Sequence, residues 1–209
     1  TVNENQAAVG TITATDEDGH TVTYSLTGTD ASSLSINSSS GVITFNSAPD
    51  YETKSSYSVT VNASDGTNNT TQALTVSITN LNDNSPVVTS SASFSADENQ
   101  TSVGTSTYSD ADGAISTYTF SLTGTDASSL SINSSSGVIT FNSAPDYETK
   151  TSYTATVNIS DGVFTTSQEI TIAITNVNEA PVFTSAGSFT VNENQAAVGT
   201  ITATDADGD

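Results

Sequence analysis

The residues best suited to chemistry form one short polar run, Asn80-Leu81-Asn82-Asp83-Asn84-Ser85-Pro86. Four amide or carboxylate side chains lie within five residues, and the run stops at a proline. Such side chains supply hard oxygen atoms, of which Ca²⁺ binds six to eight at once. A similar run, Asn176-Val177-Asn178-Glu179-Ala180-Pro181, occurs further along the chain. We therefore interpret both runs as metal-binding linkers.

The two runs separate copies of an internal repeat. Residues 26–54 recur unchanged at 122–150, and residues 1–16 recur unchanged at 190–205. A unit of about 95 residues is too long for a helical solenoid repeat and suits a small sandwich domain. The predicted division of the chain is a first unit at 1–83, which lacks its first residues, a second at 84–179 and the start of a third at 180–209.

Alternating apolar and polar residues predict strands with one buried face in each unit. Turn signals containing Gly or Pro separate these stretches, and no stretch shows a helical stripe. About seven strands per unit predict an all-β fold, namely tandem seven-stranded Greek-key antiparallel β-sandwiches joined end to end. The strands expected in the first unit are 9–14, 22–26, 34–36, 42–45, 57–63 and 74–78.

Composition excludes several classes of protein and of site. The chain has no Cys and one His, so a disulfide-stapled fold, a zinc–thiolate site and a histidine-rich metal site are ruled out. The single His20 also cannot serve a catalytic set in every unit, and no enzyme is expected. With 23 acidic residues against two basic ones, the chain should repel nucleic acid and anionic lipid. No apolar run reaches about 18 residues, so no membrane insertion is expected.

Most of the acidic residues recur at fixed places in the units. A Glu opens each unit, an Asp-x-Asp-Gly turn follows, and Asp-Tyr-Glu and Asp-Gly motifs come later. Copying explains part of this recurrence. In each Asp-x-Asp or Asp-x-Glu triplet, however, residues i and i+2 share a side, and that pairing is repulsive unless a cation lies between them. Solvated turns, ordinary type I turns and a flexible hinge remain open as plainer interpretations, and a glycosidase carboxylate pair at Asp50 and Glu52 is a remote one.

The order of these motifs resembles the cadherin repeat. The run Asn80 to Pro86 resembles the Asp-x-Asn-Asp-Asn-x-Pro linker of that family, and Asp50-Tyr51-Glu52 resembles its Leu-Asp-Tyr/Arg-Glu motif. Ser40 to Ile43 resembles the strand before that motif, and Asn176 to Phe183 resembles the linker of bacterial cadherin-like repeats. The resemblance covers the whole chain.

The resemblance implies Ca²⁺ ligands at the junctions between successive units. At the first junction these are Glu4, Asp50, Glu52, Asn80, Asn82, Asp83, Asn84, Asp110, Asp112 and Asp161. At the second junction they are Glu98, Asp146, Glu148, Asn176, Asn178, Glu179, Asp205 and Asp207. Asp16, Asp18 and Asp65 are implied to face an upstream linker. Asn80 and Asn176 stand where the family usually has Asp, and the second linker is one residue shorter than the first. Fewer or more weakly bound ions are therefore expected at the second junction.

The function implied by the resemblance is a calcium-stiffened stalk or adhesive repeat of a long bacterial surface or secreted protein. Its expected partners are neighbouring repeats of the same chain, and further copies or surface glycans and proteins are open as additional ones. A module that binds a glycan or a protein through its loops is the alternative. Because residues 190–205 match 1–16 more closely than 95–110 do, we also expect a two-unit super-repeat in a longer parent array.

Overall fold

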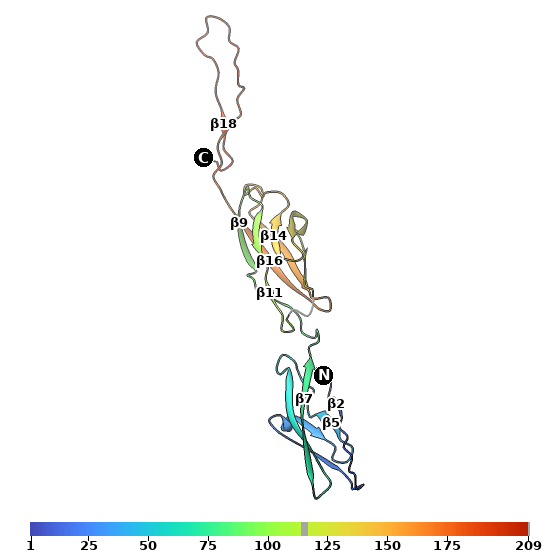
Figure 1. Cartoon of the computed structure of the whole chain (residues 1–209). Helices are drawn as coiled ribbons and strands as arrows, with labels where there is room; N and C mark the ends of the chain where they lie inside the picture. Colours follow the sequence, from blue (N-terminus) through green and yellow to red (C-terminus); the bar gives the residue numbers. More distant parts are fainter. Residues whose placement is uncertain (114–116, 209) are drawn as a thin grey trace. The chain divides into compact units, whose positions relative to one another are not determined.

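The structure is a computed structural model that describes residues 1–113 and 117–208. It divides into two compact units (Figure 1). The first comprises residues 1–84 together with 110–113, and the second comprises residues 85–109 together with 117–208. The helices of the described chain are the 3₁₀ turns η1 (Ala31–Ser33) and η2 (Ala127–Ser129), and none of its helices is long and apolar enough to cross a membrane.

The first unit is a sandwich of two sheets made from seven strands. The four-stranded sheet has the order β1 (Val2–Asn3), β7 (Asn69–Thr79), β6 (Ser56–Ser64) and β3 (Thr23–Thr27). The three-stranded sheet has the order β2 (Ala8–Thr11), β5 (Val42–Phe45) and β4 (Leu34–Ile36). The chain crosses between the sheets four times, from β1 to β2, β2 to β3, β3 to β4 and β5 to β6, as in a Greek key.

The second unit repeats this arrangement. Its four-stranded sheet has the order β12 (Thr119–Thr123), β15 (Ser152–Ser160), β16 (Thr165–Thr175) and β9 (Ser93–Asp97). Its three-stranded sheet has the order β10 (Ser102–Thr105), β14 (Val138–Phe141) and β13 (Leu130–Ile132). Two short pairs complete it, β8 (Val87–Val88) with β11 (Tyr108–Ser109) and β17 (Val182–Phe183) with β18 (Ala203–Thr204).

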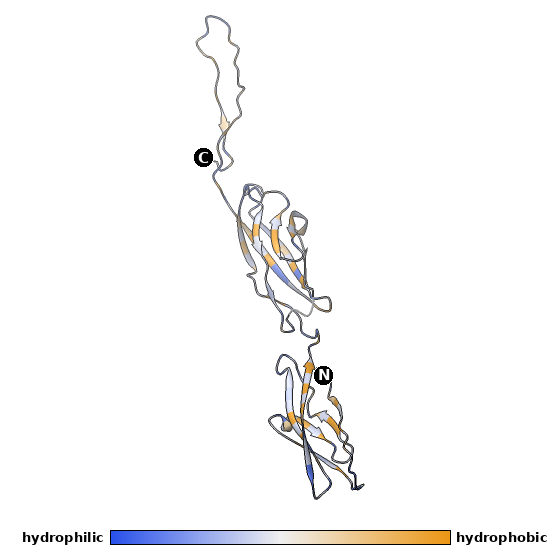
Figure 2. Cartoon of the chain, viewed as in Figure 1, coloured by the Kyte–Doolittle hydropathy of each residue, from blue (hydrophilic) through white to orange (hydrophobic). Residues whose placement is uncertain are grey.

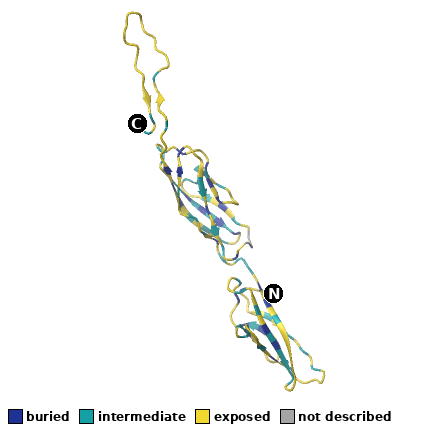
Figure 3. Ribbon diagram, turned by 60° about the vertical axis from the view of Figure 1, so that its left-hand side comes forward, coloured by how far each residue is buried: buried dark blue, intermediate teal, exposed yellow. Residues whose placement is uncertain are grey.

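The period-two alternation of the sequence places one face of each long strand in the core. In β16, Ile170, Ile172 and Ile174 are buried, and they share one cluster with Ile139 and Phe141 of the opposite sheet. Hydrophobic and hydrophilic residues alternate along the strands in Figure 2, and buried residues gather on the strands in Figure 3. Burying each large aliphatic side chain contributes about 1.5–3 kcal/mol, so these clusters hold the sheets together.

The predicted fold class is confirmed, with two local corrections. Each sandwich contains one parallel pair, β1 with β7 and β9 with β16, where a fully antiparallel fold was expected. These pairs join strands far apart in sequence, so no hairpin forces them to be antiparallel. The strand expected at 9–14 ends at Thr11, because residues 12–15 have no strand partner within the described part of the first unit.

The C-terminal segment, residues 180–208, has no buried residue, and its residues are exposed or half-buried (Figure 3). Val191 is 43% exposed, whereas its sequence equivalent Val2 is 8% exposed and pairs with Ile78. Likewise Glu193 is exposed and Glu4 is buried. The 209 residues hold no third copy of β5 or β7 for this segment to pack against, and this accounts for the difference.

Candidate metal centre

The opening glutamates of the two sandwiches are buried and held by backbone amides. Glu4 is 1% exposed, and its Oε1 and Oε2 accept hydrogen bonds from Leu81 N (2.6 Å) and Tyr51 N (2.8 Å). Glu98 is 2% exposed, and its carboxylate accepts hydrogen bonds from Val177 N and Tyr147 N, both at 2.8 Å. Each carboxylate therefore fixes the start of a linker against the loop that carries the Asp-Tyr-Glu motif.

Asp112 organises the linker of the first unit. It is 3% exposed, and its Oδ2 accepts hydrogen bonds from Asp83 N (3.2 Å) and Asn84 N (2.8 Å). Its Oδ1 accepts a hydrogen bond from the Asn84 side chain at 2.7 Å, and its backbone carbonyl accepts one from Asn80 Nδ2 at 3.0 Å. Asp110 Oδ1 in turn accepts a hydrogen bond from Asp112 N at 2.9 Å. The turn and the linker thus bring their oxygen atoms together.

Carboxylates gather around Glu52 in the first unit. Oxygen atoms of Glu4, Asp50 and Glu52 lie within 4.8 Å of one another, as do oxygen atoms of Glu52, Asp83 and Asp112. A hollow of about 210 Å³ is lined by Glu4, Asp50, Glu52 and Asp83 with two asparagines, Asn5 and Asn84. Glu52 belongs to both triplets, so the two groups form one continuous acidic site.

The electrostatics of this group favour a cation. Although Glu52 is exposed as a residue, burial of its carboxyl, followed by repulsion from Glu4, Asp112 and Asp50, raises its pKa to about 7. In contrast, the pKa of the Asp50 carboxyl is lowered, chiefly by the hydrogen bond from Thr53 N. A group that must take up a proton to relieve repulsion is one that a metal ion can stabilise instead.

The second unit builds a matching group. Oxygen atoms of Glu98, Asp146 and Glu148 lie within 4.8 Å of one another, and so do those of Glu98, Glu179 and Asp207. Burial of the Glu148 carboxyl, followed by repulsion from Glu98, Glu179 and Asp207, raises its pKa. Asp207 Oδ2 accepts a hydrogen bond from Glu179 N at 2.8 Å, as Asp112 does with the first linker.

The remaining predicted residues of this second group lie beside it. Asp207 N donates to Asp205 Oδ1 at 3.0 Å, and Asn176 Nδ2 donates to Glu148 Oε1 at 3.4 Å. Asn178 Nδ2 instead donates to the backbone carbonyl of Glu179 at 3.1 Å. The group therefore draws on the Asp-x-Asp turn and on the second linker.

Buried oxygen atoms test whether these residues fit a Ca²⁺ ion. Among the residues that the structure describes, Asn80 Oδ1, Asp110 Oδ2, Glu179 Oε2 and Asp207 Oδ1 are buried and accept no hydrogen bond. A buried oxygen without a donor costs free energy, and a cation removes that cost. The donor set is entirely oxygen, and such a set suits Ca²⁺ rather than a softer metal. The residues therefore fit the ion.

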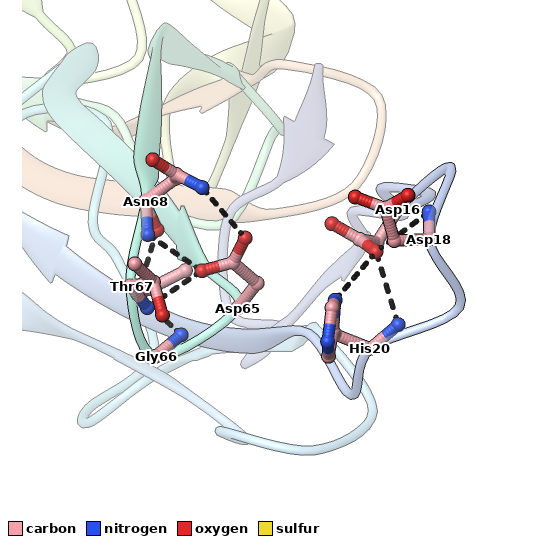
Figure 4. Close-up of polar contacts among 8 residues, drawn as sticks. Asp16, Asp18, His20, Asp65, Gly66, Thr67 and Asn68 are labelled. Carbon is pink, nitrogen blue, oxygen red and sulfur yellow. Dashed lines mark hydrogen bonds and ion pairs between the residues drawn. The ribbon is translucent and has the colours of Figure 1, made fainter.

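A third group lies in the first unit at the Asp-x-Asp turn of Asp16 and Asp18 (Figure 4). Asp16 Oδ1 accepts hydrogen bonds from Asp18 N and His20 N, both at 3.0 Å, and lies 3.3 Å from His20 Nδ1. Asp65 Oδ1 accepts hydrogen bonds from Thr67 N and Asn68 N, both at 2.6 Å. The amides of Asn68 and Thr67 lower the pKa of the Asp65 carboxyl. Asp16 and Asp65 line one hollow of about 190 Å³.

Two further residues, Asp161 and Asn82, were predicted as ligands at the first junction. Asp161 belongs to the second unit, where its Oδ1 accepts hydrogen bonds from Val163 N (2.8 Å) and Phe164 N (2.7 Å). Asn82 is half-buried in the linker. Their assignment to the first junction stays a prediction.

Sequence reasoning missed two asparagines that follow the opening glutamates. Asn5 and Asn99 both have φ of 62°, a left-handed conformation that Asn tolerates better than most residues. This conformation directs Asn5 Nδ2 to the Asp83 carboxylate and Asn99 Nδ2 to the Glu179 carboxylate. The recurrence of Glu-Asn in every unit was the available signal. The side chain of His20 is 64% exposed.

The fold and these groups define a tandem of β-sandwich domains with acidic sites at the ends of the sandwiches. The chain belongs to the cadherin domain family, whose model matches residues 1–79 and 91–177. It is 33% identical over 221 aligned positions to mouse protocadherin Fat 4, covering 96% of this chain and 4% of that protein. It is also 36% identical over 90 positions to mouse cadherin-related family member 2, covering 43% of this chain and 7% of that protein.

Solved structures support the fold. The EC1-2 fragment of human protocadherin-24 matches with a TM-score of 0.70 and 23% identity, covering 84% of this chain and 93% of that one. The EC21-23 fragment of human CDH23 matches with a TM-score of 0.70 and 20% identity, covering 98% of this chain and 82% of that one. At these identities the likeness bears on the fold alone.

Proposed function

We propose that this chain is a stretch of calcium-stiffened repeats from an extracellular adhesive or stalk protein. The observation that carries the proposal is the convergence of Glu52, Asp83 and Asp112. Asp112 is hydrogen-bonded to Asn80 and Asp110, and each of these has a buried oxygen atom that accepts no hydrogen bond in the described structure. Membership of a family of adhesion domains supports the adhesive role and argues against an enzyme. The ion would neutralise the repelling carboxylates, and the residues of the linker and the adjacent turn would then hold their positions.

The acidic site explains how such an ion would act on the chain. Glu4 and Glu52 come from one end of a sandwich, Asp83 from the linker and Asp112 from the turn after β11. Without a cation these carboxylates repel, and at an effective dielectric constant near 20 two charges 4 Å apart cost about 4 kcal/mol. An ion shared among them cross-links segments that are otherwise joined by one flexible linker. In this proposal, cross-linked linkers stiffen the array.

The source and partners belong to the same proposal. The second linker motivated the hypothesis of a bacterial surface or secreted protein, whereas the relatives reported above are from mouse. Neighbouring repeats of the same chain are the proposed partners. A module that binds glycans through its loops is the competing function, and glycan-array binding by the isolated chain, with or without calcium, would favour it.

A calcium titration by calorimetry tests the proposal. The chain should take up several ions, with dissociation constants of about 10⁻⁴ M within one or two orders of magnitude. Asp112→Ala should reduce the number of ions bound and leave the β-sheet circular dichroism in EDTA unchanged. Glu169→Ala removes an exposed acid from β16, outside every group described, and is the matched control. A titration of the native chain without heat or thermal stabilisation in millimolar Ca²⁺ would refute the proposal.

The stiffening itself calls for a separate measurement. Small-angle scattering should show a smaller maximum dimension in EDTA than in Ca²⁺, because the freed linkers sample bent arrangements. The circular dichroism of the sandwiches should not change between the two conditions. Identical scattering profiles would mean that the linkers are stiff without the ion.

A further inference from the structure

Each sandwich holds the asparagine after its opening glutamate in a left-handed conformation. Asn5 and Asn99 both have φ of 62°, and within the described parts of the two sandwiches they are the non-glycine residues with a positive φ. Asn5 N donates to Pro49 O and Asn99 N donates to Pro145 O, both at 3.0 Å. A non-glycine residue in this region costs free energy, and such residues concentrate at functional sites. The repeated conformation therefore indicates a role for the asparagine side chain.

The side chains of these asparagines donate to the acid of the linker. Asn5 Nδ2 donates to the Asp83 carboxylate, and Asn99 Nδ2 donates to the Glu179 carboxylate. Asp83 and Glu179 each belong to a carboxylate triplet of the acidic sites. An amide nitrogen is a hydrogen-bond donor, whereas the ligands of Ca²⁺ are oxygen atoms. In this arrangement each asparagine contacts the site through the linker acid and not as a ligand.

The second unit shows what this contact does to the linker acid. While Oε1 of Glu179 accepts from Asn99, its Oε2 is buried and accepts no hydrogen bond from the residues that the structure describes. Oδ1 of Asp207, a residue of the same triplet, is buried and without a donor in the same sense. Such buried oxygen atoms cost free energy, and a cation removes that cost. Asn99 thus determines which oxygen of Glu179 remains for an ion.

In the first unit a second amide shares this task. Asn84 Nδ2 donates to Asp83 Oδ1 at 2.9 Å, in addition to the contact from the opening asparagine. The residue after Glu179 is Ala180, whose side chain has no donor. Loss of the opening asparagine should therefore weaken the site of the second unit more than the site of the first.

We propose that Asn5 and Asn99 are positioning residues of the acidic sites, which set the direction of the linker carboxylate ahead of ion binding and act only through that carboxylate. This inference rests on the function proposed above and assigns the side chains that prepare the linkers for it. A carboxylate that is already held in place loses little conformational freedom on binding, so the affinity rises. Removal of an outer contact of this kind weakens metal binding by about 10- to 100-fold. We expect about 10-fold for Asn5 and about 100-fold for Asn99.

The contact itself can be measured without the ion. In ¹H–¹⁵N spectra recorded in EDTA, the side-chain amide signals of Asn5 should move in Asp83→Ala, and those of Asn99 should not. Asn5→Gly keeps the left-handed backbone and removes the amide. It should change the Tm of the first unit in EDTA by less than about 4 °C. Asn5 signals that do not move, or a larger fall in Tm, would overturn the proposal.

Calcium binding is then followed through the rise in Tm of each unit, because binding to the native state stabilises it according to the ratio of ion concentration to Kd. The Ca²⁺ concentration that gives a fixed rise in Tm should increase about 10-fold for the first unit in Asn5→Gly and about 100-fold for the second unit in Asn99→Gly. Asn194→Gly removes an exposed asparagine of the same motif with φ of 63°, and it should respond like the native chain.

A double-mutant cycle separates positioning from direct binding. In an Asp83→Ala background, Asn5→Gly should cause no further loss of affinity, because the carboxylate through which Asn5 acts is gone. A further loss would mean that Asn5 contacts the ion itself, and this would overturn the proposal. If the native chain responds to Ca²⁺ and both glycine variants respond equally, the positioning role is wrong and the proposed function stands. A native chain that does not respond to millimolar Ca²⁺ would refute both.

Discussion

The buried glutamate of the second unit offers a sharp test of how these domains are built. If Glu98 is held by the amides of Tyr147 and Val177, then Glu98→Ala should destabilise the second unit in the absence of any metal. If the side chain served only to bind an ion, the same change in EDTA would relieve repulsion and stabilise the unit. The two interpretations predict opposite signs.

The magnitude follows from the contacts. A hydrogen bond to a charged group contributes about 1.5–3 kcal/mol, and Glu98→Ala removes two. Relief of the repulsion with Glu148, whose pKa Glu98 helps to raise, offsets part of this loss. We expect a net loss of about 2–4 kcal/mol. For a domain of this size that corresponds to a fall in Tm of at least about 8 °C.

Scanning calorimetry in EDTA measures the effect, with the transition of the first unit as an internal reference. Glu98→Gln keeps one oxygen acceptor, so the Tm of its second unit should lie between that of the native chain and that of Glu98→Ala. Glu193→Ala removes the same residue from the same motif where it is exposed, and it should leave both transitions unchanged. An unchanged or raised Tm for Glu98→Ala would show that the two amide contacts do not stabilise the domain.

Three further predictions concern the first unit. Because the pKa of Glu52 is raised to about 7, Ca²⁺ binding should release about half a proton at pH 7 and about 0.9 of a proton at pH 6, and the Ca²⁺ affinity should fall as the pH falls. Calorimetry in buffers of different ionisation enthalpy measures the number of protons released. Glu52→Gln should abolish the proton release. The Lys54 ammonium lowers the pKa of Asp30 below its usual 3.8, so this contact stabilises the first unit above about pH 4, and its contribution is lost on further acidification. Lys54→Met should weaken the pH dependence of the unfolding transition of the first unit only, because Lys150 keeps the same contact with Asp126 in the second unit. Gly41→Ala would place a Cβ 2.1 Å from Ile12 O, whereas Gly19→Ala meets no atom within 4 Å at a similar positive φ; the first should therefore cost about 2 kcal/mol more than the second in urea unfolding.

The sandwiches could be predicted because their signals are local and repeated. Alternation in β6 and β7 assigns the buried faces directly, and recurrence at a fixed interval sets the number of units. The parallel pairing of β1 with β7 could not be predicted in this way. Two-residue strands carry no periodicity, and their pairing depends on where the chain crosses between the sheets.

The acidic site was predictable by residue type and less so by role. The carboxylates of Glu4 and Glu98 were expected to face an ion, and the structure shows each also accepting two backbone hydrogen bonds. Such contacts form only when a loop dozens of residues away in the sequence packs against the glutamate, and a local sequence pattern does not predict this packing. The contact of Asn5 with the acidic site depends likewise on its left-handed backbone, and this conformation cannot be inferred from a single Asn in a sequence.

Ala14 and Tyr108 stand at equivalent positions of the two units and differ greatly in size. In the first unit Tyr24 extends its hydroxyl to Ala14 N at 2.8 Å, and in the second unit Phe120 has no hydroxyl but lies 5.7 Å, ring centre to ring centre, from Tyr108. The second unit thus keeps an aromatic ring at the position of Tyr24 and has a second ring, Tyr108, on β11 opposite Val88. Either pair alone reads as ordinary core variation. Compared at one position of one fold, the pairs show that the unit with Tyr24 has the small Ala14 beside it, and the unit with Phe120 has Tyr108 in that place.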